Sequence, residues 1–226
     1  MRTAAILPVK SFDRAKQRLG ASVENQLRLA LAEAMVGDVL AALAATGAIA
    51  LTIVVTREPE AAAAAAACGA RVIGDSAESG QSAAAALGIA AAIEDGFERI
   101  LCVPGDCPAL DPAELASLLD GPGEGAEVVV LPDRHGTGTN GLLLAPPGAI
   151  EPSFGPGSRE RHVALARAAG VACRVEPLPC LQLDVDTGED LAVLRAALAG
   201  STGRAPRTRA VLGEQAGSAA AAAGRA

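Results

Sequence analysis

Aromatic side chains are almost absent from this sequence, which has three phenylalanines and neither tyrosine nor tryptophan among its 226 residues. Proteins that bind single-stranded nucleic acids stack the bases on aromatic side chains, so the scarcity argues against that class. The net charge of −7 argues against any nucleic-acid or anionic-membrane partner, because both carry dense negative charge. Apolar residues make up 50% of the chain, so a core built from Ala, Leu, Val and Ile is expected.

Long hydrophobic runs and cysteine pairs are also missing. No apolar run approaches the roughly 20 residues that a membrane-spanning helix needs, and the stretch before Lys10 resembles a strand, not a signal peptide. The five cysteines include no CxxC pair, and their odd number leaves one unpaired. Such cysteines are typical of small buried side chains in a reduced protein. We therefore expect a cytoplasmic protein without a membrane segment.

Apolar runs of strand length alternate with helix-like stretches along most of the chain. Short connections between them are typical of a parallel α/β sheet with helices on both faces. After Asp133 the pattern changes, because one strand follows another without an intervening helix. The expected strands are 4–9, 51–56, 71–73, 100–103, 127–131, 142–145, 171–176 and 181–185, and the expected helices are 23–45, 58–68, 81–94, 111–119, 158–169 and 187–198.

The chain length predicts one domain, which we place at residues 1–199. Residues 200–226 have little apolar periodicity and carry several arginines. This composition predicts a flexible C-terminal tail.

Two groups of aspartates follow predicted strands. Asp106 comes after the strand 100–103 and a Pro-Gly pair, and Asp184 and Asp186 end the predicted strand 181–185. Ligands of open α/β sheets bind outside the carboxyl ends of the strands, so these carboxylates are expected to face one crevice. Together they predict a binding site for a divalent cation, with a phosphate-containing molecule as the ligand that the cation helps to bind. Alone, Asp106 would be explained as a turn residue before the next helix.

The loop after the first predicted strand carries four cationic side chains, namely those of Lys10, Arg14, Lys16 and Arg18. A cluster of cations at a strand end, in an otherwise acidic protein, indicates a triphosphate site. The alternative is a solvated basic helix face. The loop is not a Walker A loop, because the sequence has no GxxxxGK[ST] motif.

Two glycine-rich segments in the second half of the chain suggest an anion site. The segment GTGTNG, 136–141, matches GxGxxG, but a predicted strand follows it where the dinucleotide fingerprint requires a helix. Its glycines, with Thr137, Thr139 and Asn140, would still suit close approach to an anion, although a simple hairpin explains them equally well. In FGPGSRERH, 154–162, glycines precede a helix whose expected N-cap is Ser158. Capping alone would also account for that serine. The two histidines, His135 and His162, are interpreted as surface residues.

Five motifs in order, LPVKSFDRAKQRL, PGDCPAL, DRHGTGTNGLL, FGPGSRERH and LDVDTGEDL, resemble the guanylyltransferases of coenzyme F420 biosynthesis. The resemblance spans residues 4–198. It implies a three-layer α/β nucleotidyltransferase fold with a mixed, mostly parallel central sheet, of the kind shared with molybdenum-cofactor guanylyltransferase.

The resemblance also implies roles for individual residues. Asp106, with Asp184 or Asp186, would hold Mg²⁺, and Lys10 and Asp106 would be the catalytic residues. Thr139, Gly155 and Ser158 would bind the acceptor's phosphate and carboxylate. Lys10, Lys16, Arg18 and Ser82 would contact the nucleotide, although Ser82 stands where such proteins often carry asparagine.

The implied reaction transfers GMP from GTP to phosphoenolpyruvate, and the product would pass to the next enzyme of the F420 pathway. The alternative acceptors are 2-phospho-L-lactate and 3-phosphoglycerate. A nucleotidyltransferase of the same fold with another acceptor and a non-catalytic nucleotide-binding protein are the remaining alternatives. The motifs do not determine the acceptor acid or the oligomeric state.

Overall fold

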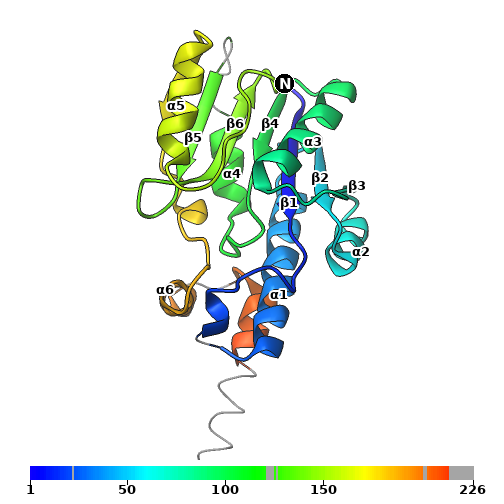
Figure 1. Ribbon diagram of the computed structural model, residues 1–226, viewed down its shortest axis with the longest axis vertical. Coiled ribbons are helices and arrows are strands. Elements are labelled where there is room, and N and C mark those ends of the chain that lie inside the picture. The colour runs from blue at the N-terminus through cyan, green and yellow to red at the C-terminus, as the bar shows by residue number, and fades with distance from the viewer. Residues whose placement is uncertain (22, 121–124, 126, 201–202, 214–226) are drawn as a thin grey trace, which may run out of the picture.

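A seven-stranded mixed sheet forms the centre of the computed structural model, which describes residues 1–21, 23–120, 125, 127–200 and 203–213 (Figure 1). The strand order is β3-β2-β1-β4-β6-β5-β7, and β6 alone runs antiparallel to its neighbours. The expectation of a mixed, mostly parallel sheet is therefore confirmed. The strands are β1 (Thr3–Val9), β2 (Leu51–Thr56), β3 (Arg71–Gly74), β4 (Arg99–Cys102), β5 (Glu127–Pro132), β6 (Thr139–Ala145) and β7 (Ala172–Val175).

Helices cover both faces of the sheet. One face packs against α1, α2 and α4, and the other packs against α3 and α5. The central strand β1 is buried on both sides, so Ala5 and Leu7 face the first group while Ala4 and Ile6 face the second. The helices are α1 (Asn25–Ala45), α2 (Pro59–Ala67), α3 (Gln81–Glu94), α4 (Pro112–Leu119), α5 (Ser158–Ala168) and α6 (Gly188–Ala199), with 3₁₀ turns η1 (Leu19–Ala21) and η2 (Pro179–Leu181).

Small residues allow α3 to approach the sheet closely. A Cβ atom at Gly88 would lie 2.5 Å from Cγ2 of Ile6 and 3.1 Å from Cγ2 of Val55. The alanines at 84, 85 and 92 are buried against the same strands. The small side chains on this face of α3 therefore let the helix backbone pack close to the strands.

A third hydrophobic cluster lies beside the carboxyl ends of the strands. It joins α1 and α6 to the loops on either side of them through Leu19, Val185 and Leu194, all fully buried. Ala205 and Leu212, from the C-terminal residues, complete it. Figure 1 shows this C-terminal stretch in orange beside α1.

The expectation of a flexible tail from residue 200 is wrong for residues 203–213. Residues 206–213 are helical, and the backbone N–H groups of Arg207 and Thr208 donate to the carboxylate of Asp38 at 3.0 and 2.8 Å. Arg204 forms ion pairs with Asp111 and Glu114. The two buried apolar residues of this segment, Ala205 and Leu212, are too few to form a recognisable periodic pattern in the sequence. Residues 201–202 and 214–226 lie outside the described residues, so the prediction is untested there.

The predicted strand 181–185 is also wrong. Leu181 ends η2, and residues 182–186 lie outside the sheet and form neither a helix nor a strand. Leu181 and Val185 are nevertheless fully buried, which explains the apolar pattern. Val185 donates its N–H to the carbonyl of Asp106, a loop residue, at 3.1 Å and not to a neighbouring strand.

Within the part of the chain that the structure describes, we find no helix with the length and apolar character to cross a membrane.

Candidate active site

A cleft of about 690 Å³ opens at the carboxyl ends of β1 and β4. Its walls come from the loops after these strands, the start of β6, the residues before α5 and the segment between η2 and α6. Most site residues predicted from the sequence line it, namely Lys10, Lys16, Arg18, Asp106, Thr139, Gly155, Ser158, Asp184 and Asp186. Segments far apart in the sequence therefore meet where the sheet's strands end, as the α/β rule predicts.

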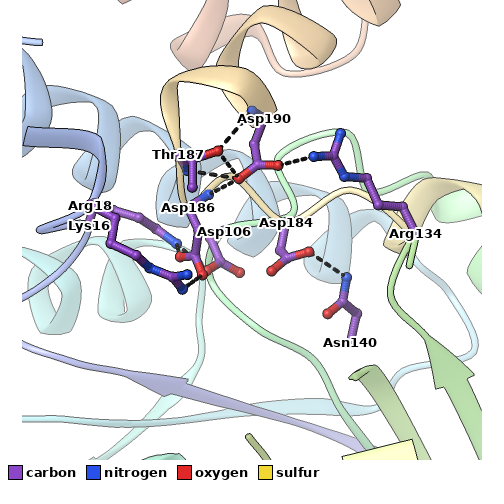
Figure 2. Close-up of polar contacts among 9 residues, drawn as sticks. All are labelled: Lys16, Arg18, Asp106, Arg134, Asn140, Asp184, Asp186, Thr187 and Asp190. Carbon is purple, nitrogen blue, oxygen red and sulfur yellow. Dashed lines mark hydrogen bonds and ion pairs between the residues drawn. The ribbon is translucent and has the colours of Figure 1, made fainter. Parts of the chain in front are cut away.

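Three carboxylates gather on one side of the cleft (Figure 2). Asp106 lies just beyond β4, and the bond from the Val185 N–H to the Asp106 carbonyl, 3.1 Å long, joins its loop to the segment between η2 and α6. Val185 is buried, while its neighbours Asp184 and Asp186 line the cleft. The sequence pattern predicted that Asp184 and Asp186 would face the cleft from the end of a strand. Both aspartates do line the cleft, although the segment that carries them is not a strand.

The backbone of Asp186 is fixed by hydrogen bonds to the start of α6. The carboxylate of Asp190 accepts hydrogen bonds from the N–H groups of Asp186 and Thr187 at 3.0 and 2.8 Å. The Thr187 side chain accepts from the Asp190 N–H in return, which makes a capping box. Arg134 donates to the other oxygen of Asp190 at 2.5 Å, and Figure 2 shows this chain of contacts leading to Asp186.

Asp184 is oriented by Asn140 of β6. The Asn140 side-chain amide donates to Asp184 Oδ1 at 3.2 Å and to the Leu181 carbonyl at 2.7 Å. One amide group therefore ties the start of β6 to the segment that carries the aspartates. Sequence reasoning placed Asn140 in a loop suited to an anion but missed its contact with Asp184, and it missed Arg134 and Asp190, which lie in the motifs DRHGTGTNGLL and LDVDTGEDL.

Lys16 lies between two of the carboxylates. Its ammonium group forms ion pairs with Asp106 and, at 2.8 Å, with Asp186, and its side chain is only 8% exposed. Burial alone would lower the pKa of Lys16, but the two carboxylates outweigh burial and raise it, so the side chain stays charged. Arg18 adds an exposed ion pair to Asp186 at 2.7 Å.

The carboxylates differ in their electrostatic surroundings. Burial, and then the neighbouring charge of Asp106, raises the pKa of Asp184. Burial also acts to raise the pKa of Asp186, but the ion pairs with Lys16 and Arg18 outweigh it and lower that pKa. Asp106 Oδ1 is buried without a hydrogen-bond partner among the described residues. An unpartnered carboxylate oxygen beside a second carboxylate is a place where a cation is favourable.

These carboxylate oxygens fit a divalent cation that is coordinated partly by the protein and partly by the phosphates of a nucleotide. In the described ranges, no three acidic, histidine or cysteine side chains form a ready-made metal cluster. Mg²⁺ is usually held by one or two carboxylates together with substrate phosphates, not by an all-protein cage. The orphaned oxygen of Asp106 and the nearby carboxylate of Asp184 match that pattern.

The basic loop owes its shape to a buried arginine of α1. Arg28 is 7% exposed, and its guanidinium donates to the carbonyls of Phe12, at 2.8 Å, and of Asp13, at 3.2 Å. Lys16 itself has a positive φ of 58°, so the chain turns sharply where it enters the cleft. Arg14 is drawn to Glu78 at 2.9 Å, away from the three carboxylates.

Hydroxyl and glycine residues form another wall of the cleft. Gly155 and Gly157 have positive φ values of 104° and 71°, which side chains rarely adopt. Gly157 is the N-cap of α5, so the expectation that Ser158 caps this helix is wrong. Ser158 is instead the first helical residue, and its hydroxyl is buried without a hydrogen-bond partner among the described residues. A free hydroxyl at a helix N-terminus is well placed to bind an anion.

Thr139, the first residue of β6, belongs to this wall and contacts His162. Its hydroxyl lies 3.0 Å from Nδ1 of His162, which is fully buried in α5. The interpretation of His162 as a surface residue is therefore wrong, whereas His135 is exposed as expected. The FGPGSRERH motif contained His162, but nothing in its spacing indicated burial.

Ser82 does not line the cleft, although its neighbours Gly80 and Gln81 do. Its hydroxyl accepts a hydrogen bond from the N–H of Phe154 at 2.8 Å. Ser82 thereby ties α3 to the loop that carries Gly155. Its assignment to the nucleotide remains a prediction from the resemblance.

Solved structures with the same architecture define the class of fold. A protein described as a nucleotide-diphospho-sugar transferase from Desulfovibrio desulfuricans G20 superposes with a TM-score of 0.77 over 96% of each chain, at 19% identity. A cytidylyltransferase from Leptospira borgpetersenii superposes with a TM-score of 0.60 over 96% of each chain, at 14% identity. The chain has the nucleotidyltransferase fold.

The family is defined by sequence. The model of the family "Guanylyl transferase CofC like" matches residues 3–205, and the chain belongs to that family. A phosphoenolpyruvate guanylyltransferase from Conexibacter woesei is 47% identical over 95% of this chain and 96% of its own length. Another, from Rubrobacter xylanophilus, is 40% identical over 87% of this chain and 95% of its own.

Proposed function

We propose that this protein is a phosphoenolpyruvate guanylyltransferase, which transfers GMP from GTP to phosphoenolpyruvate. The relatives that carry this name match nearly the whole chain. The observation that carries the proposal is that one cleft combines three carboxylates and a basic loop with the free hydroxyl of Ser158 at a helix N-terminus. Such a cleft has groups for a metal, for a triphosphate and for a small anion.

The nucleotide would enter along the basic loop. Lys10, Lys16 and Arg18 line the cleft beside Asp106 and can neutralise a triphosphate. Mg²⁺, when bound by Asp106 with Asp184 or Asp186, would neutralise phosphate oxygens and align the α-phosphate. Lys16 contacts two of these carboxylates, so its ammonium group would lie beside the phosphates of a nucleotide bound there with Mg²⁺.

The acceptor would lie on the other wall. Thr139 and Ser158 offer hydroxyl groups, and the positive φ of Gly155 opens its backbone to close approach. Hydroxyls and backbone N–H groups at a helix N-terminus suit the phosphate and carboxylate of phosphoenolpyruvate.

In the proposed reaction a phosphate oxygen of phosphoenolpyruvate attacks the α-phosphorus of GTP. The new bond joins this oxygen to the α-phosphorus, and the bond from the α-phosphorus to the bridging oxygen breaks. Pyrophosphate leaves with that electron pair, and enolpyruvoyl-2-diphospho-5′-guanosine is formed. A phosphate is already a nucleophile at neutral pH, so the site needs positioning and charge neutralisation more than a general base.

We also propose that the reaction takes place in the cytoplasm. All five cysteines are free thiols, in keeping with a reduced cytoplasmic protein. Burial raises the pKa of Cys102 to about 12, so this thiol is not a nucleophile at neutral pH. The product would pass to the next enzyme of coenzyme F420 biosynthesis.

Incubation of the protein with GTP, Mg²⁺ and one acceptor at a time tests the proposal. We expect pyrophosphate release and a guanylylated product of the correct mass with phosphoenolpyruvate. Parallel reactions with 2-phospho-L-lactate and 3-phosphoglycerate, and with CTP or UTP in place of GTP, measure specificity. A product with another acceptor or nucleotide but none with GTP and phosphoenolpyruvate would contradict the assignment. No transfer with any combination would favour a nucleotide-binding protein without turnover.

A further inference from the structure

Both ring nitrogens of His162 are engaged in hydrogen bonds inside the protein. Nε2 accepts the backbone N–H of Ser153 at 2.9 Å, and Nδ1 lies 3.0 Å from the hydroxyl oxygen of Thr139. The ring is fully buried and contacts Phe154 edge-on, with centroids 5.3 Å apart and an interplanar angle of 73°. The histidine therefore connects the cleft-lining Thr139 to the loop that leads to Gly155.

These partners determine which nitrogen carries the proton. A backbone N–H is only a donor, so Nε2 must present its lone pair to Ser153. A neutral imidazole has one N–H group, which is then on Nδ1 and is directed at Thr139. Burial, and then the charge of Arg161, lowers the pKa of His162 to about 4, so the ring is neutral at pH 7.

The proton on Nδ1 determines what Thr139 can do. One lone pair of its hydroxyl oxygen accepts from His162, so its hydrogen is directed elsewhere. Thr139 lines the cleft, and so does Ser158, whose buried hydroxyl has no partner among the described residues. Two hydroxyl groups are thus free to donate to an anion bound between them.

We propose that His162 is a positioning residue for the acceptor, because its Nδ1–H makes Thr139 a hydrogen-bond donor to the bound anion. The inference rests on the proposed function, in which Thr139 contacts the phosphate or carboxylate of phosphoenolpyruvate. His162 contacts neither substrate and exchanges no proton with them. The competing explanation is that His162 serves only to hold the Ser153 loop through Nε2.

The tautomer can be measured without any substrate. The chain has two histidines, so spectra of the ring nitrogens of ¹⁵N-histidine-labelled protein and of the His135→Gln variant assign the signals of His162. We expect a protonated Nδ1 and an unprotonated Nε2 at pH 7. The opposite tautomer, or a doubly protonated ring, would overturn the inference whatever the protein catalyses.

Two substitutions of His162 test the hydrogen bonds of its two ring nitrogens separately. The amide of asparagine lies close to the place of Nδ1, and the amide of glutamine lies close to the place of Nε2. His162→Asn therefore keeps a donor to Thr139 and loses the acceptor for Ser153, while His162→Gln does the reverse. Thermal melting of both variants first establishes that they are folded.

Steady-state kinetics then decide between the two explanations. We expect His162→Gln to raise the KM for phosphoenolpyruvate about tenfold, with little change in kcat or in the KM for GTP. His162→Asn should restore most of the acceptor affinity. Equal losses, or a larger loss in His162→Asn, would show that His162 only holds the loop and would overturn the inference.

A Thr139→Val background provides the matched control. Without the hydroxyl, His162→Asn and His162→Gln should have the same KM for phosphoenolpyruvate, because the donor has lost its partner. A persistent difference would contradict a role that acts through Thr139. If the wild-type protein transferred no GMP to phosphoenolpyruvate, the proposed function would fail while the measured tautomer still stood.

Discussion

Val185 donates its backbone N–H to the carbonyl oxygen of Asp106, and this bond, 3.1 Å long, joins the two loops that carry the acidic residues of the cleft. The side chain of Val185 is fully buried in the cluster that also holds Leu19 and Leu212. The position of the carboxylates therefore depends on packing among segments at both ends of the chain.

Asp106→Asn should abolish turnover and leave the protein folded. The substitution keeps the shape of the side chain but removes the charge that we propose binds metal, so we expect kcat/KM to fall about 100-fold or more. The substitution removes one of the two carboxylates that pair with Lys16, but Asp186 keeps its ion pair. It also relieves the repulsion between Asp106 and Asp184, so we expect little change in melting temperature. Asp13→Asn, at an exposed position, is the control. Near-normal activity at saturating Mg²⁺ would show that Asp106 is only a turn residue.

Ser158→Ala should weaken acceptor binding without a stability cost. The Ser158 hydroxyl has no hydrogen-bond partner among the described residues, and Gly157 is the residue that caps α5. We expect the affinity for phosphoenolpyruvate to fall by about 1–2 kcal/mol, because a hydrogen bond to a charged group is lost. Calorimetric titration with phosphoenolpyruvate and with GTP, together with thermal melting, checks this. Unchanged phosphoenolpyruvate affinity would place the acceptor elsewhere in the cleft.

Truncation after residue 202 should destabilise the protein and reduce its activity. It removes Ala205 and Leu212 from the third cluster and leaves Asp38 without the N–H groups it accepts. Leu212→Ala alone should cost about 2 kcal/mol or more in the free energy of unfolding. A truncation after residue 213 keeps the packed helix and serves as the matched control. Equal melting temperatures for the two truncations would contradict the packing role.

Acid should destabilise the protein partly through His162. Its folded-state pKa of about 4 lies below the ordinary value of 6.5, so the unfolded state binds more protons between these two pH values. The contribution of this histidine to stability is complete above pH 6.5 and is lost as the pH falls toward 4. The difference between the two pKa values corresponds to about 3 kcal/mol.

Urea denaturation from pH 7 to pH 4 measures this effect. The wild type should lose stability more steeply than His162→Asn, because asparagine does not titrate. The difference between the two curves removes the contributions of the carboxylates they share. Parallel curves would show that His162 is protonated equally easily in the folded and unfolded states.

Much of this protein could be predicted from its sequence by itself. The alternation of apolar runs and helix-like stretches predicted nearly every strand and helix, because each element carries its own pattern of apolar residues within a short stretch of sequence. The strand-end position of Asp106 and the cations around Lys16 likewise indicated a cleft at the carboxyl ends of the strands. The ordered motifs indicated the family to which the chain belongs.

Only the tertiary structure decided how the site residues are held. The apolar pattern made 181–185 look like a strand, although its backbone partners include the Asp106 carbonyl, the Arg134 N–H and the Asn140 amide, which no local pattern encodes. His162 and the C-terminal helix looked exposed because their partners, Thr139 and Asp38, are distant in the sequence. A hydrogen bond between distant residues leaves no periodicity in the chain, so these roles emerge only when the fold brings the two partners together.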